Sequence, residues 1–85
     1  MTWIVIVARA AQKQLARFPA RDQSKIAGAI QAMAEDPFSG DIIKLEGANN
    51  RWRRRLGNYR VFFAADTAAR TVAVSAIVRR TSTTY

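Results

Sequence analysis

The chain has 85 residues, a length that suits one small domain with a single modest core. Hydrophobic residues make up 49% of it, too many for a disordered chain, and the lack of cysteine excludes disulfides and thiolate metal sites. The net charge is +8. Residues 1–43 hold five basic and four acidic side chains, whereas residues 44–85 hold nine and two. The second half therefore carries a field that attracts polyanions such as nucleic acid.

Residues 2–7 are predicted to form a strand, because they are aromatic or β-branched and include no breaker. Their apolar run is unbroken, so we expect both faces of this strand to be covered at least in part. The run is too short for a membrane span, and it lacks the basic leader and cleavage site of a signal peptide. We therefore expect a cytoplasmic protein, which the lack of cysteine fits.

Two helices are predicted next, over residues 9–17 and about 20–35. The first ends at Phe18-Pro19 and the second at Asp36-Pro37, since a residue before proline avoids the α region. Gly28 costs the second helix roughly 1 kcal/mol relative to alanine, and we expect it to allow a close approach to the first helix or the sheet. Apolar residues recur at helical spacing, which predicts a helical hairpin with one apolar side. They are Ala8, Ala11, Leu15, Phe18, Ile26, Ala29, Ile30, Met33 and Ala34.

Residues 37–50 are predicted to be a connector, punctuated by glycine, proline, serine and asparagine. We expect Ile42, Ile43 and Leu45 to pin this connector to the core. The rest of the chain reads as β structure, in three strands over residues 51–56, 59–65 and 71–78, the last of them apolar enough to be central in a sheet.

The order β-α-α-β-β-β predicts one α+β domain over residues 1–85. We expect a small, mostly antiparallel sheet with the helical hairpin packed on one face. The pattern alone leaves open which edge the first strand joins.

Gly57-Asn58 is a two-residue hairpin turn and fixes the register of its two strands. Arg55 then lies opposite Arg60, a like-charged pair that folding alone would not select and that a bound polyanion would compensate. Because side chains alternate across strands, the two faces differ. The core face is expected to hold Trp52, Leu56, Tyr59, Val61 and Phe63, with Arg54 as an odd member that snorkels to the edge. The cationic face is expected to hold Arg51, Arg53, Arg55, Arg60 and Phe62.

The parity of the last strand decides how this cationic face continues. If the valines at 72, 74 and 78 face the helices, Arg79 joins the cationic face, and the small Ala73 and Ser75 floor a shallow groove. Tyr85 could then fold back as a stacking platform for a base. The alternatives are a solvated charged face and a frayed terminal tyrosine.

Three stretches resemble the RelE/ParE superfamily of type II toxin–antitoxin systems: Lys44 to Gly47, Trp52 to Phe62, and Val78-Arg79-Arg80 with Tyr85. The family pattern is leucine-x-glycine, a basic strand, a glycine turn, Tyr-Arg-Val, and a closing strand with an arginine and a terminal tyrosine. The resemblance covers essentially the whole chain. It implies a small bacterial toxin of the stress response.

For RelE-like members, the resemblance implies an endoribonuclease that cuts mRNA at the ribosome and inhibits translation. Arg53 and Arg55 would contact the mRNA and take part in cleavage, and Arg60 would hold the scissile phosphate. Arg79 would stabilise the transition state or the leaving group, and Tyr85 would stack on a nucleotide. The RNA 2′-OH would attack the adjacent phosphate and give a 2′,3′-cyclic phosphate, with no metal or other cofactor. Further RNA-binding residues are expected to be Arg51, Phe62 and Arg80.

Positioning and charge neutralisation by arginines suit phosphoryl transfer, but a general base is missing. The chain has no histidine, residues 47–65 hold no carboxylate, and arginine stays protonated. This gap favours a second hypothesis, a ParE-like poison of DNA gyrase that needs no proton relay. A third hypothesis is a basic nucleic-acid-binding module without toxin activity.

The resemblance also implies a protein partner. A cognate antitoxin would neutralise the basic face through a helix or an extended acidic segment, and we expect it to carry a DNA-binding portion for autorepression. Ile42, Ile43 and Leu45 are candidate contacts for it.

Overall fold

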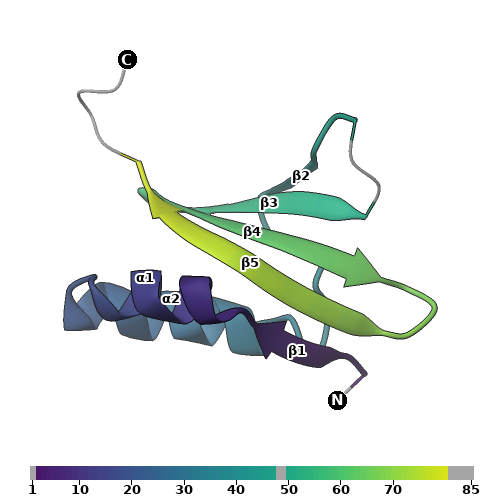
Figure 1. Ribbon diagram of the computed structural model, residues 1–85, viewed down its shortest axis with the longest axis horizontal. Helices are drawn as coiled ribbons and strands as arrows, with labels where there is room; N and C mark the ends of the chain where they lie inside the picture. Colours follow the sequence, from purple (N-terminus) through teal and green to yellow (C-terminus); the bar gives the residue numbers. More distant parts are fainter. Residues whose placement is uncertain (1, 48–49, 81–85) are drawn as a thin grey trace.

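The computed structural model describes residues 2–47 and 50–80, and its two helices cover one face of a five-stranded sheet (Figure 1). The predicted α+β architecture is therefore confirmed. The elements in chain order are β1 (Ile4–Val7), α1 (Arg9–Ala16), α2 (Ala20–Ala32), β2 (Ile42–Lys44), β3 (Arg51–Leu56), β4 (Tyr59–Asp66) and β5 (Thr71–Arg79).

The two helices meet at Pro19, which caps the N-terminus of α2. Gln23 stabilises this junction, because its Nε2 donates to the carbonyl oxygen of Phe18 at 2.7 Å. α2 stops at Ala32, earlier than predicted, and residues 33–35 continue as turns. The apolar sides of both helices pack on the sheet, and the side chains of Ile26 and Met33 are fully buried there.

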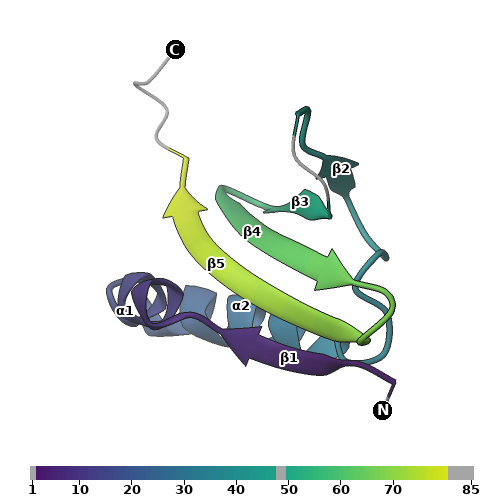
Figure 2. The ribbon, with the colours of Figure 1, turned by 45° about the vertical axis from the view of Figure 1, so that its right-hand side comes forward.

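The strands lie in the order β1-β5-β4-β3-β2, antiparallel except for the parallel pair β1–β5. β1 is therefore an edge strand whose Ile4 and Ile6 are 64% and 54% exposed, while Val5 and Val7 pack against the core. The expectation that β1 is covered on both faces is wrong, because the helices cover one face only (Figure 2).

β2 forms the other edge and lies within the segment predicted to be a connector. It has only three residues, paired with β3, which is too short for a periodic signal in the sequence. Ile42 packs against the core as expected, whereas Ile43 is 44% exposed.

A β-bulge at Ser75 reverses the alternation of side chains within β5. Phe62 pairs with Ala76, but the next residue, Phe63, pairs with Val74, so Ser75 is extra. As a result Ile77 is buried and Val78 is 44% exposed on the opposite face. The expectation that the valines at 72, 74 and 78 share a face is therefore wrong for Val78.

Gly28 also differs from expectation. It lies in an exposed part of α2, and a Cβ at this position would meet nothing within 4 Å. No close approach of another element explains this glycine.

No helix in residues 2–47 and 50–80 has both the length and the apolar character needed to cross a membrane.

Candidate nucleic-acid interface

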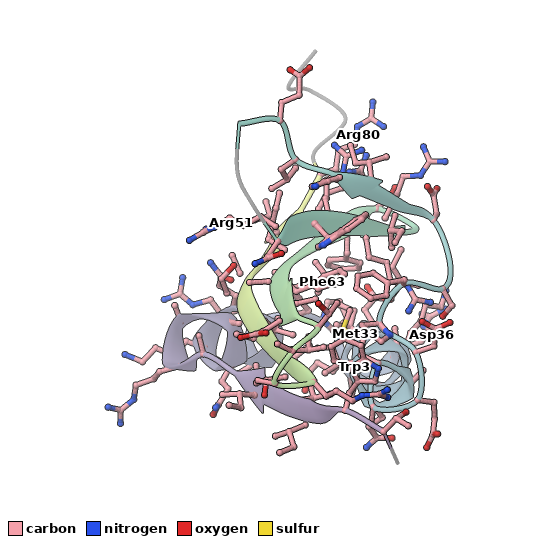
Figure 3. All side chains as sticks on the ribbon, turned by 90° about the vertical axis from the view of Figure 1, so that its right-hand side faces the viewer. Trp3, Met33, Asp36, Arg51, Phe63 and Arg80 are labelled. Atoms are coloured by element: carbon pink, nitrogen blue, oxygen red, sulfur yellow. The ribbon has the colours of Figure 1, made fainter. Side chains whose placement is uncertain are left out.

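The face of the sheet turned away from the helices, here called the open face, carries the predicted cationic side chains. The register between β3 and β4 is the predicted one, with Arg55 opposite Arg60 and Arg53 opposite Phe62. Tyr59, Val61 and Phe63 alternate with these positions and are buried against the helices. Figure 3 shows Phe63 inside the curve of the sheet and Arg51 pointing away from it.

A first row of side chains crosses the open face at the end of the sheet near the Gly57-Asn58 turn. It contains Asp41, Arg55, Arg60 and Val78, since Arg60 pairs with both Arg55 and Val78. Asp41 joins this row just before β2, because its carbonyl oxygen accepts the backbone N–H of Arg55 at 2.8 Å. Its carboxylate also accepts a hydrogen bond from Nε of Arg55, at 2.7 Å between two exposed side chains. The row therefore combines two guanidinium groups with one carboxylate.

The second row, one step further along the strands, contains Ile43, Arg53, Phe62 and Ala76. Arg53 is half-buried, and its Nε is buried without a hydrogen-bond partner among the described residues. The third row has Arg51 opposite Ala64, which in turn lies opposite Ala73. Positive charge thus runs along β3, while the β4 and β5 positions beside Arg51 and Arg53 are apolar.

A groove of about 400 Å³ occupies this apolar part of the open face. Ala73 and Ser75, the residues expected to floor a groove, both line it, although Val78 does not face the helices as that expectation required. The other lining residues are Leu45, Arg51, Trp52, Phe62, Phe63, Ala64, Ala76 and Val78.

Arg54 is the odd member of the core-side face, as predicted, and its side chain is half-buried. Its guanidinium packs on Gly40, where a Cβ would lie 3.0 Å from Arg54 Cζ. Nε and Nη1 of Arg54 have no hydrogen-bond partner within residues 2–47 and 50–80. Gly40 has a φ of +89°, a conformation that favours glycine.

Arg79 does not join the cationic face, because the bulge at Ser75 places it on the side that carries Ile77. It pairs with Tyr59, and its guanidinium lies 5.9 Å from the centre of the Tyr59 ring. Tyr59 in turn donates its hydroxyl hydrogen to Oδ2 of Asp22 on α2, at 2.6 Å. This hydrogen bond, and then burial, raise the pKa of Tyr59 above its ordinary value.

Arg80 takes the open-face position that was expected for Arg79. Its backbone N–H donates to the carbonyl oxygen of Asn58 at 2.6 Å, so the ladder between the strands continues one residue past β5. Alternation then places Arg80 on the side of Val78, one step beyond the first row toward the Gly57-Asn58 turn. Tyr85 lies outside the described residues.

No cluster of histidine, cysteine, aspartate or glutamate that could hold a metal ion occurs in the part of the chain that the structure describes.

The family model for the ParE toxin of the type II toxin–antitoxin system parDE matches residues 5–83. The chain belongs to this toxin family. The RelE/ParE relationship that the sequence predicted is therefore confirmed, and the protein is a toxin of a type II toxin–antitoxin module. No curated protein matches the sequence.

Solved structures share the fold of this toxin. The archaeal RelE–RelB complex from Pyrococcus horikoshii matches with a TM-score of 0.84 and 24% identity, over 96% of this chain and 99% of that chain. The RelBE2 complex from Mycobacterium tuberculosis matches with a TM-score of 0.79 and 21% identity, over 94% and 100%. A YoeB/ParE toxin from Agrobacterium tumefaciens matches with a TM-score of 0.74 and 19% identity, over 92% and 99%.

Asp41 lies on the open face but was not predicted as a site residue. It falls outside residues 47–65, which hold no carboxylate, and it directly precedes β2, a strand that was not predicted. In the sequence, the one sign of this short strand and of the aspartate beside it is that Asp41 directly precedes two isoleucines.

Proposed function

We propose that the toxin cuts mRNA at the ribosome and that the first row of the open face is its reactive centre. The observation that carries this proposal is the juxtaposition of Asp41, Arg55 and Arg60. Two arginines directly opposite each other form a site for the scissile phosphate, which relieves the repulsion between them. The carboxylate beside Arg55 supplies a proton acceptor that was missing from residues 47–65.

In the proposed reaction, the 2′ oxygen of a ribose forms a bond to the adjacent phosphorus, and the bond to the 5′ oxygen of the next nucleotide breaks. Asp41 accepts the proton of the 2′-OH, and a water molecule supplies a proton to the leaving 5′ oxygen. Arg55 and Arg60 neutralise the charge that develops on the phosphoryl oxygens. The products are a 2′,3′-cyclic phosphate and a 5′-OH.

The other predicted residues bind or orient the message. Arg51 and Arg53 contact phosphates along β3, and Phe62 lies between Arg53 and Ala76 on the same face. In this proposal Arg80 replaces Arg79 in the role that the family resemblance implies, which is to stabilise the transition state or the leaving group. Tyr85 remains a predicted stacking residue.

A cell-free translation reaction with a defined message and purified toxin tests this proposal, with primer extension to map the message ends. We expect arrested translation with discrete cuts, and both should be lost in Arg60→Ala. Arg21→Ala is the matched control, because Arg21 is an exposed arginine on α2, in the helix layer. Arrest that persists in Arg60→Ala would overturn the assignment of the site.

A second candidate function is inhibition of DNA gyrase, as in ParE-like members. Two observations favour it: the family model that matches is that of a ParE toxin, and the chain has no histidine. An intact message together with inhibited supercoiling would establish this function instead.

We also propose a cognate antitoxin as the protein partner. The apolar side chains Ile4, Ile6, Ile43 and Val78 are all exposed and all lie on the open face. Ile43 is paired with Arg53 and Val78 with Arg60, so apolar and cationic groups are neighbours there. A segment with apolar and acidic residues fits such a surface. Ile43→Glu should weaken the toxin–antitoxin complex, whereas the equivalent change at Ala16, exposed on α1, should not.

A further inference from the structure

We infer that the groove on β4 and β5 is a binding subsite for a single nucleobase of the RNA strand whose phosphates contact the arginines of β3. This inference rests on the proposed function, since it assumes that RNA is the ligand of the open face. It extends that proposal from the phosphates, which are alike in every sequence, to a base, which differs between messages.

The bulge in β5 builds the floor of this groove. Ala73, Ser75 and Ala76 are consecutive small residues of the open face, because the extra residue at the bulge interrupts the alternation. Side chains this short leave the backbone of β5 accessible from the open face. Phe62 and Val78 are larger side chains of β4 and β5 that line the same space, and side chains of a strand stand roughly perpendicular to the sheet. The groove therefore has a floor of small side chains with taller, mostly apolar walls.

A mostly apolar groove of this size suits a base. Its volume of about 400 Å³ lies at the small end of the range of ligand sites, roughly 300–1,000 Å³. Single-stranded RNA is bound through stacking of its unpaired bases on aromatic and flat side chains, which every base can do. Phe62 is half-buried and is the one phenylalanine of the β3–β4 hairpin whose register places it on the open face.

Charge complementarity favours a single strand of nucleic acid as the occupant, and under the proposed function this strand is RNA. Arg51 lines the groove, and Arg53 lies directly opposite Phe62 on the neighbouring strand. Neighbouring strands are about 4.8 Å apart, so a guanidinium of β3 and the groove lie within reach of the phosphate and the base of one nucleotide. Among the described residues, no acidic side chain lines the groove. A strand of RNA can thus place its phosphates along the arginines of β3 and one base beside Phe62.

Binding of two fluorescent single-stranded RNAs tests this inference with the full chain. The two have the same length and number of phosphates, but one lacks its central base. We expect the wild-type toxin to bind the RNA with the complete set of bases about tenfold more tightly, the usual size of one stacking contact. Anisotropy at fixed salt measures both affinities.

Variants that fill the groove without changing the charge give the decisive comparison. Ala73→Leu and Ala76→Leu should remove the preference for the central base and leave the affinity for the abasic RNA unchanged. Ala73 is exposed, so its variant remains informative if the half-buried Ala76 does not tolerate leucine. Ala10→Leu is the matched control, because Ala10 is an exposed alanine of α1 on the other side of the molecule.

Three outcomes would overturn the inference. They are a wild-type toxin without base preference, a preference that survives in both groove variants, and groove variants that lose antitoxin binding only. The last would make the groove an anchor for a protein side chain. Message cleavage is measured separately, so the two proposals are distinguishable. A base preference without cleavage contradicts the proposed function alone, and cleavage without a base preference contradicts the groove alone.

Discussion

The guanidinium of Arg79 lies over the ring of Tyr59, 5.9 Å from its centre, on the side of the sheet that packs against the helices. Tyr59 is buried and hydrogen-bonded to Asp22, so this arginine forms part of the contact between sheet and helices. The neighbouring Arg80 falls on the opposite side. Two consecutive arginines therefore have different roles.

We expect Arg79→Ala to lower the melting temperature by a few degrees and to leave RNA affinity nearly unchanged, because it removes a cation–π contact on the helix side. Arg80→Ala should weaken RNA binding, since its side chain is placed on the open face. Thermal unfolding and RNA anisotropy on both variants check this pair. An Arg79→Ala toxin with the larger loss of RNA affinity would contradict the placement.

The hydrogen bond between Tyr59 and Asp22 predicts a dependence of stability on alkaline pH. Asp22 raises the pKa of Tyr59 above its ordinary value of 10.0, so the folded state keeps this proton where the unfolded state loses it. The stabilising contribution is therefore complete below pH 10.0 and is lost as the pH rises toward the higher folded-state pKa. Denaturant unfolding at a series of pH values should show a steeper alkaline decline for wild type than for Tyr59→Phe.

Asp22→Asn provides the control for this effect, because asparagine keeps an acceptor for the hydroxyl but removes the charge. The tyrosinate absorbance of Tyr59, obtained as the difference between wild type and Tyr59→Phe, should appear at lower pH in Asp22→Asn. An unchanged titration of Tyr59 in this variant would show that Asp22 does not raise the pKa of Tyr59.

Two glycines should respond in opposite directions to alanine. Gly28 lies in the exposed interior of α2 with open space around it, so Gly28→Ala should raise the free energy of unfolding by about 1 kcal/mol. Gly40 has a φ of +89°, and a Cβ there would meet the Arg54 guanidinium at 3.0 Å, so Gly40→Ala should destabilise. Urea unfolding of both variants measures the difference. A stable Gly40→Ala variant would mean that Arg54 can leave this position at little cost.

The salt dependence of RNA binding should report the arginines of the open face one at a time. Each phosphate contact on single-stranded nucleic acid contributes about 0.7 to the slope of log affinity against log salt concentration. Arg53→Ala should reduce the slope by about this amount, whereas Arg21→Ala on α2 should leave it unchanged. Equal slopes for wild type and Arg53→Ala would exclude Arg53 from phosphate binding.

The sequence was sufficient for the β3–β4 hairpin, because a two-residue turn and strict alternation together fix which residues face each other. It was also sufficient for the presence of the two helices and for their junction at Pro19, although α2 ends at Ala32, before the predicted stop at Asp36-Pro37. The open-face arginines of this hairpin followed from the same two rules. These features depend on turn residues, prolines and the alternation of neighbouring side chains, all of which can be read from a single sequence.

The parts that the sequence did not predict depend on contacts between distant segments. The bulge at Ser75 exists only in the pairing with β4, and no residue type at this position signals it; the error at Val78 and Arg79 followed directly from it. β2 is three residues long and forms a strand through its pairing with β3, which the sequence does not reveal. Asp41 could not be assigned to the cationic face until β2 was known, because its contact with Arg55 spans 14 residues.

The proposed cleavage of RNA by the row formed by Asp41, Arg55 and Arg60 is tested most directly by mapping message ends. The translating cell-free reaction contains wild type, Asp41→Asn or Arg60→Ala. Asp41→Asn removes the proposed proton acceptor but keeps an oxygen opposite Arg55. We predict that both variants still bind RNA, and that cuts ending in a 2′,3′-cyclic phosphate disappear in both. Cuts of undiminished rate in Asp41→Asn and Arg60→Ala, or no cuts with wild type, would contradict the account.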